Sequence, residues 1–172
     1  MQNVSKDAYV WTGLSKTRSY REWKLLERMA ELGLPTPRPV ALQIKRTGLC
    51  YRSDIVTEEI KEAESFSEIL KQRPATSDEW QLVGETIKQF HESQVFHADL
   101  NANNILLTNS SCYWIDFDRG RIQGGDRWKT AVIARLKRSL EKLKGKHEAF
   151  CFTENDWEKL LRAYGNPSIP TD

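Results

Sequence analysis

The chain has 172 residues, a formal net charge of +2 and 39% hydrophobic residues, including six tryptophans. This composition is globular, and the length fits one domain or two small lobes that share a site. No apolar run approaches the ~18 residues of a membrane-spanning helix, and we expect no signal peptide. The three cysteines are far apart and form no CxxC motif, which argues against a zinc site; we expect buried, reduced thiols.

The order of the predicted elements indicates an α+β chain with a strand-rich N-terminal part and a larger helical C-terminal part. Thr76 and Glu79 form a T-x-x-E capping box at the start of one helix. In chain order we predict a short strand at residues 9–11, a helix at 18–32, hairpin strands at 40–45 and 49–57, a short helix or linker at 61–72, a helix after Thr76, a short strand in "CYWIDFDRG", helices at 129–144 and 154–164, and a frayed tail from 165.

The stretch "VFHADLNANNILL" concentrates short polar side chains between two apolar runs. Asn104 follows Asp99 by five residues, and Asp116 follows Asn104 by twelve, at the end of an apolar strand. This H-x-D-x-x-x-x-N pattern followed by D-F is the signature of protein-kinase-like catalytic sites. The alternative is an ordinary polar loop in which Asp99 and Asn101 cap a turn, but it does not explain the second acidic group.

The residue types suggest roles in phosphate transfer from ATP. Asp99 is the candidate base for an acceptor hydroxyl, and Asn104 and Asp116 are the candidate Mg²⁺ ligands. For His97 we favour a packed ring that holds the loop over a catalytic role, because Asp99 already suits an alcohol acceptor. Asp118 is either a supporting acid or a further metal ligand, and the sequence leaves both open.

The chain resembles the lipopolysaccharide core kinases, a family of the protein-kinase-like superfamily. The resemblance is carried by "FHADLNANNILL" with "WIDFDRGRI", by "TRSYREWKLLERMAELGLPTPRPVA", by "YRSDIVTEEI" and by "RLKRSLEK" with "FTENDW". It implies a two-lobed fold and phosphorylation of a 3-deoxy-D-manno-octulosonic acid (Kdo) hydroxyl on the lipid A inner core by ATP. It also implies a peripheral location on the cytoplasmic side of the inner membrane. We expect a partial N-lobe at residues 1–60 and a helical C-lobe at 61–172.

The resemblance extends to individual residues. Asp99 matches the active-site acid, and Asn104 and Asp116 match the metal-binding positions. Glu22 matches the helix glutamate that pairs with a strand lysine, although a solvated helix charge is the simpler interpretation. Glu58 and Ile60 lie in the segment that matches the hinge, whose backbone would meet adenine.

Two departures from protein kinases favour a small-molecule or sugar substrate. Asn101 stands where protein kinases usually have lysine, and Asp118 replaces the glycine of D-F-G. Another departure is that the sequence contains no G-x-G-x-x-G, and only 21 residues precede Glu22. We therefore expect a late start codon or a truncation, with nucleotide bound in another way as the alternative. Other functions left open are an aminoglycoside- or choline-type kinase and a non-catalytic kinase-like fragment.

A basic helix follows the second acidic group. Between Arg127 and Lys146 there are eight lysines or arginines and one acid, Glu141. The simple interpretation is a helix that packs on the core and exposes a solvated basic face, with Arg135, Arg138 and Lys142 pointing away. The alternative is that this face meets anionic lipid headgroups or substrate phosphates. No aromatic interleaving supports a nucleic-acid partner.

Overall fold

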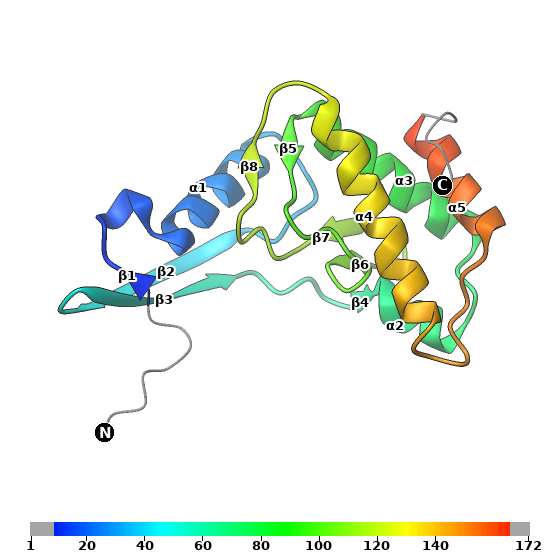
Figure 1. Cartoon of the computed structure of the whole chain (residues 1–172), viewed down its shortest axis with the longest axis horizontal. Helices are drawn as coiled ribbons and strands as arrows, with labels where there is room; N and C mark the ends of the chain where they lie inside the picture. Colours follow the sequence, from blue (N-terminus) through cyan, green and yellow to red (C-terminus); the bar gives the residue numbers. More distant parts are fainter. Residues whose placement is uncertain (1–8, 166–172) are drawn as a thin grey trace.

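The computed structural model describes residues 9–165. A three-stranded sheet with a helix alongside it lies at one end of the molecule, and most of the helices lie at the other end (Figure 1). The sheet has the antiparallel order β1-β3-β2, where β1 is Tyr9–Val10, β2 is Pro39–Thr47 and β3 is Cys50–Thr57. Gly48 has a φ of 61°, a backbone conformation that suits the tight turn between β2 and β3. The predicted hairpin and the α+β class are confirmed.

Helix α1 (Arg18–Glu31) follows a short 3-10 turn, η1 (Leu14–Lys16), and connects the sheet region to the main core. The Thr17 side chain caps α1 by accepting a hydrogen bond from the Tyr20 N–H. Leu25, Leu26 and Met29 are buried and belong to the same hydrophobic cluster as the C-terminal helices. Helix α1 is therefore fixed against the part of the molecule that carries the polar loop.

As far as residue 165, the C-terminal part contains four helices and short strands. The helices are α2 (Phe66–Gln72), α3 (Ser77–Glu92), α4 (Arg127–Lys144) and α5 (Glu154–Tyr164). The strands are β4 (Glu64–Ser65), β5 (Val95–Phe96), β6 (Ile105–Leu107), β7 (Cys112–Trp114) and β8 (Arg121–Ile122). Sheet β4-β6-β7 holds the polar loop between β5 and β6, and β8 pairs with β5. The predicted capping box at the start of α3 is present.

An aromatic core lies directly beneath the polar loop. Phe90 of α3 stacks on Trp114 of β7 with ring centroids 4.3 Å apart, and Phe117 packs against the same phenylalanine at 5.8 Å. The His97 ring packs against Phe117 with a centroid distance of 4.8 Å. These rings are almost completely buried, so the two segments that carry the acidic groups rest on a rigid base.

Some sequence expectations need correction. Of the three cysteines, only Cys112 is buried, and its burial raises the pKa of the thiol to about 12; Cys50 is exposed and Cys151 is partly exposed. All three are free thiols, as expected. In the segment 61–72 the helix covers only Phe66–Gln72. The predicted tail, apart from Gly165, lies outside the described residues, and the division into lobes at residue 60 stays a prediction.

None of the helices within residues 9–165 combines the length and the apolar character that crossing a membrane requires.

Candidate active site

The polar loop between β5 and β6 is held by His97. Its Nδ1 accepts a hydrogen bond from the Asp99 N–H at 3.1 Å, so its Nε2 carries the proton and donates to the Ile115 carbonyl at 3.0 Å. The ring is 1% exposed, and burial is the main cause that lowers the pKa of His97 below its ordinary value. The neutral ring thus connects the loop to the segment before Asp116, which agrees with the packed role that the sequence favoured.

Asp99 is exposed at the surface of the loop, where its carboxylate contacts α4. Arg135 donates to Asp99 Oδ1 from Nε at 3.1 Å, and its Nη2 lies 3.0 Å from the same oxygen. The second carboxylate oxygen, Oδ2, has only a long contact of 3.4 Å with the Asn101 amide nitrogen. Asp99 is therefore oriented by one cation and keeps an oxygen that can accept the proton of an approaching hydroxyl.

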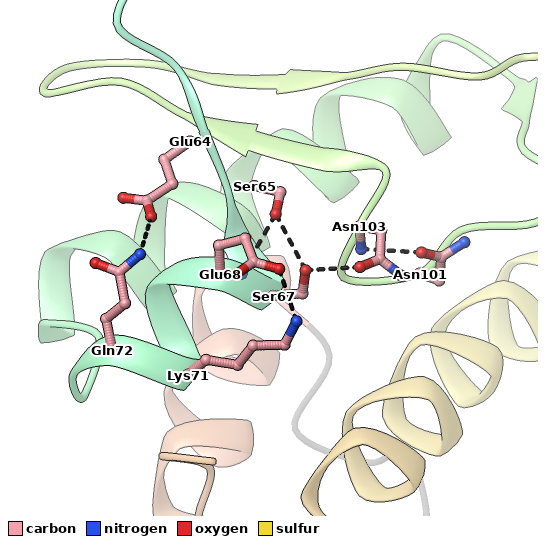
Figure 2. A network of polar contacts seen from close by, with 8 residues as sticks. All are labelled: Glu64, Ser65, Ser67, Glu68, Lys71, Gln72, Asn101 and Asn103. Carbon is pink, nitrogen blue, oxygen red and sulfur yellow. Dashed lines mark hydrogen bonds and ion pairs between the residues drawn. The ribbon is translucent and has the colours of Figure 1, made fainter. Parts of the chain in front are cut away.

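The asparagines give the loop its shape. The amide nitrogens of Asn101 and Asn104 both donate to the Asp99 carbonyl, at 2.8 and 3.0 Å. Figure 2 shows that Asn101 also accepts the backbone N–H of Asn103, at 2.9 Å, and that Ser67 of α2 donates to Asn103 Oδ1 at 2.6 Å. The Ser67 N–H donates to the Ala102 carbonyl at 3.1 Å. The first turn of α2 therefore supports the loop through two hydrogen bonds from one residue.

Asp116 lies just after β7 in a strained conformation. Its φ of 63° is in the left-handed region, which aspartate tolerates better than most residues. It lines a cavity of about 290 Å³ together with Asp99 and Asp118. Strained residues gather at functional sites, so the conformation and the cavity both support a functional role for this segment.

Asp118 has a partner of its own. Arg18, in the first turn of α1, donates from Nε to Asp118 Oδ1 at 2.7 Å, and its Nη2 is ion-paired with Oδ2. Both side chains are about one-third exposed, so the pair contributes at most about 1 kcal/mol. It joins α1 to the Asp116 segment, and of the two roles left open by the sequence it favours the supporting one.

Glu22 of α1 also lies beside this segment. Its burial, and to a smaller extent the nearby Asp116 carboxylate, raises the pKa of Glu22 above its ordinary value, while the Phe117 backbone and Arg18 oppose the shift. The structure therefore brings Glu22 next to the acidic cluster rather than leaving it as a solvated helix charge. Its role toward nucleotide stays a prediction.

The other predicted ligands lie around this centre. Asn104 is 8% exposed and does not line the cavity of Asp99 and Asp116. Its Nδ2 donates to Asp99, and its Oδ1 has no hydrogen-bond partner within residues 9–165. An amide oxygen and a carboxylate are the oxygen donors that Mg²⁺ prefers, so Asn104 and Asp116 fit this ion chemically.

Glu58 and Ile60 are not brought to this centre. They line a separate cavity of about 490 Å³ with the α1–β2 loop, and Asp99, Asp116 and Asp118 do not line it. The Glu58 N–H donates to the Arg38 carbonyl at 2.8 Å, so this N–H is not free to bind adenine. The Ile60 N–H has no hydrogen-bond partner among the described residues and stays the better candidate for a contact with adenine.

Sequence reasoning missed two residues that touch the loop. Arg135 was assigned to a face that points away, yet it is the residue that contacts the Asp99 carboxylate. Ser67 was not singled out, although it is fully buried and supports Asn103. The only signal for the first was that Arg135 is one of eight lysines and arginines between Arg127 and Lys146, and an isolated serine gave none for the second.

The fold and the acidic loop together define a kinase-like protein. The model of the lipopolysaccharide kinase (Kdo/WaaP) family matches residues 1–164. This chain therefore belongs to the lipopolysaccharide kinase (Kdo/WaaP) family, and membership of a kinase family implies ATP as the phosphate donor.

Curated relatives agree with this membership. The 3-deoxy-D-manno-octulosonic acid kinase of Haemophilus influenzae (strain PittEE) is 40% identical over 167 residues, which cover 94% of this chain and 69% of the relative. Proteins with the same name from Actinobacillus succinogenes and Photobacterium profundum are 38% and 40% identical, over 95% and 94% of this chain and 70% and 69% of their own lengths.

Proposed function

We propose that this chain transfers the γ-phosphate of ATP to a hydroxyl group of Kdo during lipopolysaccharide core biosynthesis. The name shared by the curated relatives supports this substrate. The observation that carries the proposal is that Asp99 and Asp116, from two separate segments, line the same cavity. A carboxylate for the acceptor and a second one for the donor's metal are what phosphate transfer to an alcohol needs.

In the proposed reaction the acceptor hydroxyl oxygen forms a bond with the γ-phosphorus, and the bond to the β-phosphate oxygen breaks to release ADP. The free Oδ2 of Asp99 accepts the hydroxyl proton, while His97 and Arg135 hold the loop and the carboxylate in place. Positioning supplies most of the rate acceleration in this chemistry, so the hydrogen bonds around Asp99 matter as much as its charge.

We further propose that Asn104 and Asp116 hold Mg²⁺. Residues 9–165 contain no cluster of three or more His, Cys, Asp or Glu that could hold a metal ion. One amide and one carboxylate would therefore be joined by water and phosphate oxygens, as Mg²⁺ permits. When bound, the ion would neutralise charge on the phosphates.

The test is transfer of labelled γ-phosphate to a Kdo-bearing lipid A acceptor in the presence of Mg²⁺. We expect Asp99→Asn to lower kcat by about 10²-fold or more, because the proton acceptor is lost. The matched control is Asp54→Asn on β3, since Asp54 is exposed and lies outside the cavity. Unchanged kcat in Asp99→Asn would exclude Asp99 as the base, and transfer only to soluble alcohols would exclude the glycolipid substrate.

A peripheral location on the cytoplasmic side of the inner membrane is part of the proposal. Support comes from the glycolipid acceptor and from exposed cations on and just after α4, such as Lys144 and Lys146. Sedimentation with vesicles tests it: the protein should co-sediment with anionic vesicles at low salt and be released by salt. Recovery of all the protein in the supernatant at low salt would contradict it.

A further inference from the structure

We propose that a basic groove along α4 binds the carboxylate of the acceptor sugar, with Arg135 as the residue that positions this carboxylate relative to Asp99. The inference rests on the proposed function, because it takes the acceptor to be a sugar acid. It assigns a binding site to a surface that the phosphate-transfer reaction by itself does not require.

The groove is a cavity of about 400 Å³ between the polar loop and α4. Asp99 and Arg135 line both this groove and the cavity that contains Asp116, so the two spaces meet at this ion pair. A sugar in the groove would therefore present a hydroxyl to Asp99 beside the cavity that contains Asp116. The remaining lining residues are Asn101, Asn103, Arg138, Ser139, Lys142, Leu143 and Lys146.

The charge in the groove is unbalanced. Four cations line it, namely Arg135, Arg138, Lys142 and Lys146, against the single carboxylate of Asp99. Among residues 9–165, Arg138, Lys142 and Lys146 have no ion-pair partner. By contrast, two lysines of α4 that lie outside the groove are paired, Lys129 with Asp126 and Lys137 with Glu154. The groove itself therefore carries an excess of positive charge, which suits an anionic ligand.

The contacts of Arg135 favour a carboxylate on the reacting sugar over a more distant anion. Its Nε and Nη2 both lie about 3 Å from Asp99 Oδ1, so its guanidinium is in direct contact with the proposed base. The planar guanidinium has five N–H donors and binds carboxylates in pairs of hydrogen bonds. Nη1 has no partner among the described residues, so Arg135 can contact Asp99 and a second carboxylate together.

The experiment compares two acceptors: the Kdo-bearing glycolipid, and the same molecule with the sugar carboxylate converted to a neutral amide. The wild-type chain should prefer the acid by roughly 10–100-fold in kcat/KM, as expected when a charge-assisted hydrogen bond to a guanidinium is lost. In Arg135→Gln this preference should fall to a few-fold, with the larger effect on the KM for the acid, and Arg135→Lys should restore part of it.

The matched control is Arg127→Gln, which makes the same change at an exposed arginine of α4 that lines neither cavity and should keep the full preference. Equal preference for the acid in Arg135→Gln and in the wild type would overturn the inference while leaving the proposed function intact. An acceptor that lacks the lipid phosphates tests the other anionic groups of the glycolipid. If removal of these phosphates abolishes activity while conversion of the carboxylate to the amide has no effect, the groove binds the phosphates, and the inference is overturned.

The failure of the proposed function gives a different result, namely no phosphate transfer to either acceptor by the wild-type chain. Calorimetric titration of the full chain with the two acceptors then decides the inference, because it needs no turnover. Tighter binding of the acid than of the amide, lost in Arg135→Gln, supports the groove. Equal binding of both acceptors, or binding of neither, overturns it.

Discussion

The Nδ1 atom of His97 accepts a hydrogen bond from the backbone N–H of Asp99, and this contact of 3.1 Å sets the direction in which the loop leaves β5. The opposite nitrogen of the same ring donates to Ile115, the residue before Asp116. One buried neutral ring thus fixes the distance between the candidate base and the candidate metal ligand. Its value to the site is geometric, because with 1% of its surface exposed it is enclosed by the core and not open to a substrate.

We therefore expect His97→Phe to fold but to lower kcat by roughly 10–100-fold, because a misplacement of about 1 Å costs that much in a positioned site. The variant should also lose about 1–3 kcal/mol of unfolding free energy, since the Ile115 carbonyl and the Asp99 N–H lose their partner. Steady-state kinetics and urea unfolding measure both effects. The exposed His147 gives the control His147→Phe, and unchanged kcat in His97→Phe would contradict the positioning role.

Ser67 supports the loop from α2, so Ser67→Ala should affect catalysis from a position that touches no substrate. The change removes the 2.6 Å hydrogen bond to Asn103 and should lower the unfolding free energy by about 1 kcal/mol. We expect a several-fold lower kcat with little change in the KM for ATP. Ser110→Ala, at an exposed turn, is the control, and equal kcat in the two variants would show that the loop keeps its shape without Ser67.

The sequence predicted the elements well because their signals are local. Amphipathic spacing gave α1, α4 and α5, and a T-x-x-E pattern gave the start of α3, all within one or two residues of the observed bounds. The short spacing between the loop and the next strand predicted that Asp99 and Asp116 would lie together, and both line one cavity, whereas Asn104 lies outside it.

Contacts between distant elements could not be predicted in this way. Asp99 and Arg135 are 36 residues apart, and their pairing depends on how α4 crosses the loop, which helical periodicity does not determine. Periodicity placed Arg135 on the exposed face correctly, but an exposed residue of one helix can still contact another segment. The same reason applies to Ser67, whose partner Asn103 is also 36 residues away.

His91 makes stability depend on pH. It is 1% exposed on α3, and burial, aided by the nearby Lys129, lowers the pKa of His91 from 6.5 to about 3. Between these pH values the unfolded chain binds a proton that the folded chain does not, so the unfolding free energy falls as the pH decreases. The expected slope from this one group is about 1.4 kcal/mol per pH unit near pH 5.

The measurement is the urea unfolding free energy at several pH values between 6 and 4.5. His91→Phe should flatten the slope by nearly one proton compared with the wild type, because phenylalanine does not titrate. The exposed His147, as His147→Phe, is the control for a histidine outside the core. The same slope in His91→Phe and in the wild type would contradict a depressed pKa at this position.

The contact between α3 and α5 depends on Gly84, which is buried where the two helices meet. A Cβ atom at this position would lie 2.4 Å from the Leu160 carbonyl oxygen and 2.8 Å from the Ala163 Cβ, both closer than contact allows. Gly84→Ala gains up to about 1 kcal/mol of helix propensity. Forcing the helices apart costs about 1–3 kcal/mol or more, so we expect net destabilisation.

Gly145→Ala is the matched control, because it makes the same chemical change at the end of α4. There the nearest atom to an added Cβ is 3.6 Å away, and the backbone is right-handed, so no strain is expected. Thermal unfolding should therefore show a Tm for Gly84→Ala several degrees below that of the wild type, with Gly145→Ala close to the wild type. Gly84→Ala at or above the wild-type Tm would mean that α5 shifts on α3 without loss of packing.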